Sequence, residues 1–248
     1  RLWLSLIVDE DDIENRESLP NLDFKIMQGN SLIEEFGGKK FSNELINPNT
    51  NNQLSLGIDN SSESYTKLLD NLNDTQEEYI YTKKMQKKIL LKKSFQNLIL
   101  KVFSEAIKDS KIDNKSEIIN RLLDLLKSNK ECNFFPWKLY FLDVFKNNHG
   151  FDLVIGNPPY IEHSKISNSD KKIFKKNFST YDSWADIYCL FYELGINLLN
   201  KKGILFYITS NSFLRAKYGE KIRSYISNNQ NIISLYNIDK SQLFDDAT

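Results

Sequence analysis

The stretch from Phe151 to Tyr160 (FDLVIGNPPY) constrains the fold of this chain more than any other segment. It begins as an apolar run typical of a buried strand and ends in Asn157-Pro158-Pro159-Tyr160. Because proline fixes φ at about −65° and has no N–H, the two prolines predict a stiff loop whose carbonyls stay free to accept hydrogen bonds. Asn157 adds a side-chain carbonyl, and Tyr160 adds a flat ring. Together they predict an acceptor-rich pocket for an amino group on a planar ring, such as a base extruded from a duplex.

Strands and helices alternate through the second half of the chain. The apolar patterns predict a strand at Phe151–Ile155, a helix at Ser183–Leu199, a strand at Ile204–Thr209, a helix at Tyr218–Asn228 and a strand at Ile232–Ile238. An earlier strand is expected at Asn21–Met27, where apolar and polar residues alternate. This order is typical of an α/β fold with a mainly parallel sheet covered by helices on both faces.

Three polar stretches follow expected strands and should meet at one edge of the sheet. They are Gly29-Asn30, Asn157-Pro158-Pro159-Tyr160 and Ser210-Asn211. In open sheets of this class, ligands bind beyond the carboxyl ends of the strands. We therefore expect the functional site at this edge.

Residues 42–133 have a different character from the segments on either side. Ser42–Ser64 is rich in Asn and Ser and predicts an exposed loop. Tyr65–Lys127 contains no Pro or Gly, and its apolar residues recur every three or four positions, which predicts two or three amphipathic helices. A block of this size between strands is an insertion, because ordinary connections are far shorter. Its lysines are expected to face water rather than to form a specific basic groove.

The composition narrows the class of protein but not its partner. With 33 basic and 33 acidic residues the formal net charge is +0, which neither indicates nor excludes a nucleic-acid binder. Cys132 and Cys189 are too few for a disulfide scaffold, and no Cys/His spacing resembles a zinc site, so no metal is expected. No apolar run reaches the roughly 18 residues of a membrane span, and no leader resembles a signal peptide. We expect a soluble cytoplasmic protein.

The Asn157–Tyr160 motif after its strand resembles the catalytic motif of adenine-N6 DNA methyltransferases that use S-adenosylmethionine. The wider chain is similar to the bifunctional type IIG restriction-modification enzymes, in which one chain methylates and cleaves DNA. Five further segments carry this resemblance, namely RLWLSL at residues 1–6, Gly29–Leu32, Phe135–Trp137, Asp186–Tyr188 and Ser210–Leu214. The resemblance covers most of the chain outside the helical insertion.

The resemblance assigns Asn157, Pro158, Pro159 and Tyr160 to catalysis. Asn157 and the Pro158 carbonyl would accept hydrogen bonds from the amino group of the target adenine, which turns its lone pair toward the methyl sulfonium. Tyr160 would stack on the flipped base. No general base is needed before transfer, because the methyl group already carries a cationic leaving group, so positioning and electrostatics are the main contributions.

The resemblance assigns Gly29, Asn30 and Asp186 to the binding of S-adenosylmethionine. Asn30 would bond the adenine ring of the cofactor, and Asp186 would help to shape the pocket. The family's glycine-rich loop and its ribose-binding acid are absent from this sequence, and the Gly37-Gly38 pair comes too late to replace that loop. We therefore expect these 248 residues alone to bind the cofactor weakly or not at all.

The resemblance also implies a partial Rossmann-like methyltransferase sheet that lacks the first strands of the fold. Residues 1–41 would be the N-terminal part of the core, 42–133 the loop and helical insertion, and 134–248 the catalytic half. The chain opens inside an apolar stretch and ends without tail-like composition, as expected for a piece of a longer protein. A nuclease domain would precede it, a target-recognition domain would follow it, and double-stranded DNA would be the partner.

Two other functions stay open on the sequence. Similar Asn-Pro-Pro-Tyr loops serve methyltransferases that act on protein glutamine or on ribosomal RNA bases, although these enzymes are usually compact and the long insertion argues against them. A catalytically silent module for DNA binding or subunit contact is the other alternative, although intact Asn157 and Tyr160 argue against a decayed site. The sequence indicates neither the DNA recognition sequence nor the oligomeric state.

Overall fold

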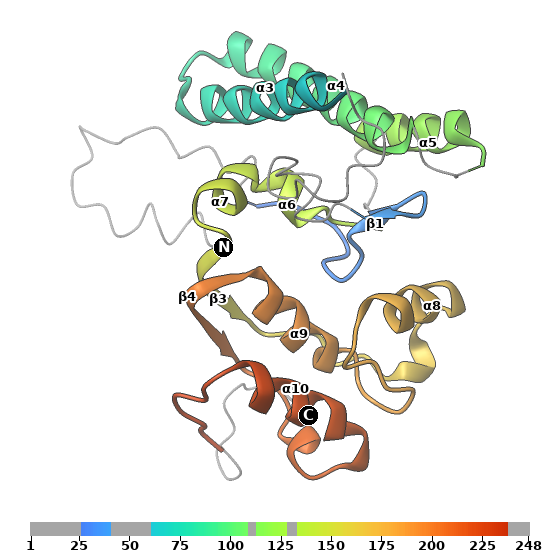
Figure 1. Ribbon diagram of the computed structural model, residues 1–248, viewed down its shortest axis with the longest axis vertical. Helices are drawn as coiled ribbons and strands as arrows, with labels where there is room; N and C mark the ends of the chain where they lie inside the picture. Colours follow the sequence, from blue (N-terminus) through green and yellow to red (C-terminus); the bar gives the residue numbers. More distant parts are fainter. Residues whose placement is uncertain (1–25, 41–60, 109–112, 128–132, 238–248) are drawn as a thin grey trace, which may run out of the picture.

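The computed structural model describes residues 26–40, 61–108, 113–127 and 133–237. In chain order the elements are β1 (Glu35–Phe36), β2 (Lys39–Lys40), α3 (Ser61–Tyr81), α4 (Met85–Lys108), α5 (Lys115–Lys127), α6 (Trp137–Tyr140), α7 (Leu142–Asn147), β3 (Phe151–Gly156), the 3₁₀ turn η2 (His163–Lys165), α8 (Asn168–Asn177), α9 (Tyr188–Leu198), β4 (Leu199–Tyr207), the 3₁₀ turns η3 (Ser212–Leu214) and η4 (Lys217–Gly219), and α10 (Glu220–Asn229). They form three tiers: the long helices α3 to α5, then the β1–β2 hairpin with α6 and α7, then the β3–β4 pair with α8 to α10 (Figure 1).

The amphipathic helices expected between residues 65 and 127 are confirmed, and there are three of them among the described residues. The apolar side of α4 is buried through Phe95, Ile99, Val102, Phe103 and Ile107, which recur at helical spacing. The predicted end of the exposed loop at Ser64 is wrong, because α3 already begins at Ser61. None of the described helices is both long and apolar enough to cross a membrane.

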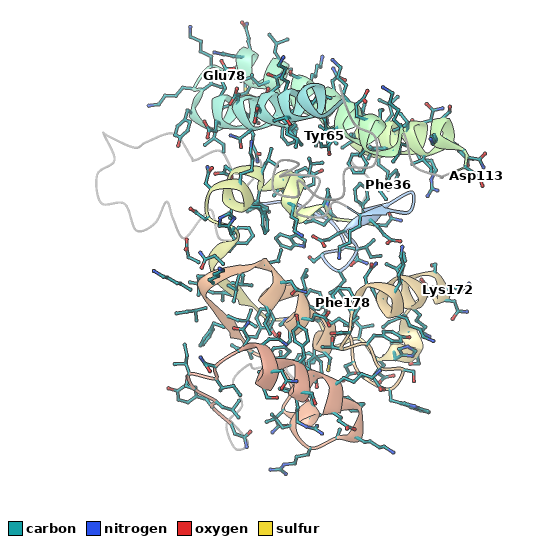
Figure 2. The ribbon with its side chains drawn as sticks, in the orientation of Figure 1. Phe36, Tyr65, Glu78, Asp113, Lys172 and Phe178 are labelled. Atoms are coloured by element: carbon teal, nitrogen blue, oxygen red, sulfur yellow. The ribbon has the colours of Figure 1, made fainter. Side chains whose placement is uncertain are left out.

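Aromatic side chains join the long helices to the middle tier. Phe36, labelled in Figure 2, lies 4.7 Å from Phe134 and meets Phe103 of α4 edge-on at 6.0 Å between ring centroids. Each such pair stabilises the packing beyond the area it buries. The middle tier is tied to the lower one by Glu35, whose carboxylate accepts hydrogen bonds from Lys176 and Asn177 at the end of α8. The helical block is therefore packed onto the rest of the described chain.

A pair of parallel strands forms the centre of the lower tier. β3 and β4 pair in register from Leu153 beside Ile204 to Gly156 beside Tyr207. A parallel pair needs a long crossover between its strands, and here the crossover carries α8 and α9. Helix α9 covers one face of the pair, and the close approach is made at its buried Gly195, next to Leu205 and Tyr207.

The expectation that helices cover both faces of the sheet is wrong for the described part of the chain. The side chains on the face opposite α9 are apolar and 41 to 68% exposed: Leu153, Ile155, Ile204, Phe206 and Ile208. They alternate along each strand, as the two-residue period of a strand requires. The patterns of both strands therefore encode two buried faces, and the described residues cover only one.

The ends of several expected elements differ from the structure. The helix expected from Ser183 begins five residues later at Tyr188, because residues 183–187 form turns, and β4 already begins at Leu199. The strand expected at 232–238 is wrong over its described residues, which pair with no strand. Of the strand expected at 21–27 only the last two residues are described, and they are not in a strand.

Gly195 gives a direct test of how closely α9 packs on β4. A methyl group added there would lie 2.5 Å from the Tyr207 hydroxyl oxygen and 2.6 Å from the Leu205 Cδ1 atom. We expect Gly195→Ala to lower the free energy of unfolding by about 1–3 kcal/mol, as overpacking usually does. Chemical denaturation of the full-length gene product measures this loss. Adding Tyr207→Phe removes the nearer clashing atom and should restore part of the stability, whereas an additive double variant would contradict the contact.

Candidate functional site

The Asn157–Tyr160 motif lies directly beyond the carboxyl end of β3 and beside the end of β4. The Gly156 carbonyl accepts a hydrogen bond from Ile208 N at 3.2 Å, so the loops that follow the two strands start next to each other. Pro158 is buried, while Asn157 is exposed and Tyr160 is 56% exposed. Within the described residues the Asn157 side chain has no hydrogen-bond partner. The motif is thus anchored by a proline and presents an amide and a ring to solvent.

Tyr160 packs against buried aromatic side chains, Tyr188 and, behind it, Phe213, which we call the aromatic floor. Its ring meets Tyr188, the first residue of α9, edge-on at 5.8 Å, and Tyr188 in turn meets Phe213 of η3 at 6.2 Å. The loop is also tied to α9 through its backbone, since Ile187 N donates to Ile161 O at 3.1 Å. Burial raises the pKa of the Tyr188 phenol well above its usual range, so this hydroxyl stays protonated.

The loop after β4 contacts helix α9 beside this aromatic floor. The Tyr192 hydroxyl of α9 lies 2.7 Å from the Thr209 hydroxyl, and the Tyr192 ring lies 5.3 Å from Phe213. Ser210 and Ser212 hydroxyls are 2.7 Å apart within this loop. Two of the three polar stretches expected at the sheet edge, those after β3 and β4, are therefore side by side.

His163 and Tyr181 join the segment after the motif to the segment before α9. His163 Nε2 lies 2.8 Å from the Tyr181 hydroxyl oxygen. Partial burial, followed by the nearby charge of Lys171, lowers the pKa of His163, while Asp182 opposes this shift. The shift favours the neutral imidazole, which can still share a hydrogen bond with the Tyr181 hydroxyl.

Asp186 lies in the turn that leads into α9, close to the motif but not in direct hydrogen-bonded contact with it. Its carbonyl oxygen accepts a hydrogen bond from Cys189 N at 3.1 Å, and its side chain is half-buried.

Burial raises the pKa of the Cys189 thiol to about 12, so Cys189 is an inert, buried side chain at neutral pH. Among the described residues, no cluster of three or more His, Cys, Asp or Glu side chains could hold a metal ion.

Gly29 and Asn30 lie in a loop that packs on residues 134–137. A Cβ atom at Gly29 would lie 2.8 Å from the Phe134 carbonyl oxygen, so only glycine fits here without movement. Asn30 Oδ1 accepts a hydrogen bond from Leu32 N at 3.2 Å, which leaves its amide NH₂ as a donor. The described residues just before this loop, 26–28, are not in a strand, and no described hydrogen bond joins the loop to the motif.

The sequence did not point to Glu193, a buried acid in α9. Its carboxylate accepts hydrogen bonds from Ser179 N at 3.0 Å, Ser179 Oγ at 3.0 Å and Thr180 N at 2.8 Å. These bonds fix the turn before Tyr181, and thereby the His163 contact beside the motif. The available signal was a single charged residue within the mostly apolar stretch Tyr188–Leu198.

An open cavity of about 520 Å³ lies at the other end of β4, away from the motif. Its lining is mostly polar and comes from the start of β4 and the end of α10, including Asn200, Lys201 and Asn229. Parallel sheets bind their ligands at the carboxyl ends of the strands. We therefore assign the candidate site to the motif edge and not to this cavity.

Comparison with known proteins shows the family of this chain. Residues 1–244 match the family of Eco57I restriction-modification methylases. The chain belongs to this family. The match spans the motif, both of its flanking loops and the helical block, so the resemblance to restriction-modification methyltransferases is confirmed.

Individual relatives align with parts of this Eco57I-family chain. The type II methyltransferase M.BstVI of Geobacillus stearothermophilus is 30% identical over 115 residues, which are 46% of this chain and 20% of that protein. The type II restriction enzyme and methyltransferase RM.Eco57I of Escherichia coli is 32% identical over 104 residues, 41% of this chain and 10% of that protein. The type II methyltransferase M.XhoI of Xanthomonas vasicola is 30% identical over 96 residues, 39% and 18% of the two chains. The alignments thus span a fifth of these relatives or less.

Proposed function

We propose that this chain is the catalytic part of a site-specific DNA methyltransferase that transfers a methyl group from S-adenosylmethionine to N6 of a flipped adenine in double-stranded DNA. The observation that supports it most is the motif loop at the carboxyl end of β3, where Asn157 and Tyr160 are exposed around a buried Pro158. Membership of the restriction-modification methylase family supports DNA as the substrate.

Asn157 and the Pro158 carbonyl act as paired acceptors for the amino group of adenine. Asn157 Oδ1 is available because its side chain has no hydrogen-bond partner within the described residues. Two acceptors hold the two N–H bonds and orient the nitrogen lone pair toward the incoming methyl group. Acceptors that are already in place need no reorganisation in the transition state, which is how fixed dipoles accelerate a reaction.

Tyr160 stacks on the flipped adenine and fixes its plane. The ring is 56% exposed, while its edge contact with Tyr188 limits its rotation. Stacking on an aromatic side chain compensates in part for the stacking that the base loses when it leaves the duplex. Pro159 keeps the spacing between the acceptors and the ring rigid, because its φ is fixed.

The residues present fit one part of S-adenosylmethionine. The free amide NH₂ of Asn30 is a donor suited to a ring nitrogen of the cofactor's adenine, and Gly29 lets the chain pass close to Phe134 beneath it. Asp186 helps to shape the pocket from the turn before α9. When bound, the cofactor supplies a methyl group on a positively charged sulfur, which needs no further activation.

We further propose that residues 1–41 and 134–248 share one methyltransferase core, and that residues 42–133 are an insertion in it. Cleavage of DNA by the whole gene product belongs to the same proposal, because RM.Eco57I is named both a restriction enzyme and a methyltransferase.

A methyl-transfer assay on the full-length gene product tests the function. The protein is incubated with labelled S-adenosylmethionine and, separately, with unmethylated bacterial genomic DNA, bacterial RNA and a peptide-chain release factor. We expect label in DNA only, and nucleoside mass spectrometry should identify it as N6-methyldeoxyadenosine. Methylated cytosine, label in RNA or protein, or no transfer to any of the three would contradict the proposal.

A further inference from the structure

Trp184 is an exposed side chain on a fixed backbone. It is 83% exposed, more than any other large apolar side chain in the described residues. Its backbone is held in a turn, because Trp184 N donates to Asp182 Oδ1 at 2.9 Å and Ala185 N donates to Asp182 O at 3.3 Å. Ala185 is buried in the small core beneath the site, together with Tyr188. The indole is therefore presented to solvent from a rigid support.

The turn that carries Trp184 lies at the same edge as the catalytic motif. Three residues further on, Ile187 N donates to Ile161 O, and Tyr188 meets the ring of Tyr160. Two exposed aromatic side chains, Tyr160 and Trp184, thus arise from adjoining loops. Single exposed apolar residues are common on protein surfaces and need no explanation by themselves. Trp184 differs from such residues because its turn adjoins the loop of Tyr160, the residue proposed to stack on the flipped base.

Exposed cations lie on the loops that follow β3 and β4, which start side by side. Lys165 ends η2, Arg215 follows η3 and Lys217 begins η4, and within the described residues none of the three forms an ion pair. The nearby carboxylate of Asp182 lies 3.9 Å from Lys221 Nζ, so its charge is partly compensated. Cations around aromatic rings are the usual composition of a surface that binds phosphate groups and stacks on bases.

We propose that Trp184 is a DNA-contacting residue that stacks on a nucleobase next to the flipped adenine. This rests on the proposed function and adds to it a second stacking side chain, supplied by the turn before α9. When one base leaves the duplex, its neighbour loses a stacking partner, and a flat apolar ring can replace that partner without reading the sequence. Lys165, Arg215 and Lys217 would bind the phosphates that flank this base.

Kinetics of Trp184→Ala test the proposal in the full-length gene product. Removing one aromatic ring from a base stack should raise KM for unmethylated genomic DNA by about tenfold or more, with a smaller effect on kcat. Trp184→Phe keeps a flat ring and should retain most of the wild-type KM. Tyr81→Ala is the matched control, because Tyr81 is 81% exposed at the end of α3, and it should leave KM unchanged.

Two further readouts separate this proposal from the proposed function and from misfolding. Trp184→Ala should keep the wild-type melting temperature, because the indole is largely exposed. Its KM for S-adenosylmethionine should also stay unchanged, since only DNA contacts are lost. An active wild-type protein with unaltered KM for DNA in Trp184→Ala would overturn the role of Trp184 and leave the proposed function standing. A wild-type protein without methyl transfer would overturn both.

Discussion

The Asn157→Ala variant of the full-length gene product is expected to lose methyl transfer by a factor of about 100 to 1,000 in kcat, the usual cost of removing one preorganised polar group from a reaction site. The physical reason is that the adenine amino group would keep a single acceptor, the Pro158 carbonyl, and its lone pair would no longer be oriented. The assay is steady-state transfer of labelled methyl groups to unmethylated genomic DNA, which gives kcat.

The fold should not respond to this change. Asn157 is exposed and unpartnered within the described residues, and substitutions at such positions usually change stability by less than about 0.5 kcal/mol. Asn228→Ala is a matched control, because Asn228 is also exposed but lies near the end of α10, beside the cavity at the other end of β4. Unchanged kcat in Asn157→Ala would remove the catalytic assignment, as would an equal loss in Asn228→Ala.

The motif loop could be predicted from sequence because its determinants are local. Pro158 and Pro159 restrict their own φ angles, and the apolar run before them specifies a strand that ends there. The structure adds what these residues touch. Pro158 is buried, and Tyr160 rests against Tyr188, a residue 28 positions further along the chain. No local pattern specifies such a contact.

The failed predictions concern elements that depend on distant partners. The segment expected as a strand at 232–238 has the right apolar content, yet a strand exists only where a neighbour supplies its hydrogen bonds, and the described residues supply none. Its Ile233 and Tyr236 are exposed, as are the apolar side chains on the open face of the β3–β4 pair. This segment and that face have the apolar patterns of buried strands, but the described part of the chain does not bury them.

The start of α9 shows the same limit on a smaller scale. Apolar periodicity extends back to Ser183, but residues 183–187 form turns that place Trp184 in solvent and Ile187 against the motif loop. Hydrogen bonds to Asp182 and Ile161 outweigh the helical pattern there. Propensity is a weak prior where side chains and distant carbonyls offer the backbone other partners.

Glu193→Ala is expected to cost about 1–3 kcal/mol of stability, because it leaves the buried Thr180 N–H without an acceptor. The backbone donors to its carboxylate are Ser179 N and Thr180 N, in the turn before Tyr181, and Glu193 itself is buried. A loss of this size is a large fraction of the stability of a typical domain. Denaturation of the full-length gene product measures it, and hydrogen exchange at residues 178–182 locates it.

Two variants decide whether the loss comes from these bonds. Glu193→Gln keeps a carbonyl oxygen that can accept from the turn, so it should lose clearly less stability than Glu193→Ala. Glu77→Ala, an exposed acid on α3, should change stability by no more than about 0.5 kcal/mol. If Glu193→Ala melts like the wild type and residues 178–182 exchange no faster, the carboxylate does not hold the turn. If the turn loosens as expected, the His163–Tyr181 contact beside the motif should loosen with it, and methyl transfer should fall even in molecules that remain folded.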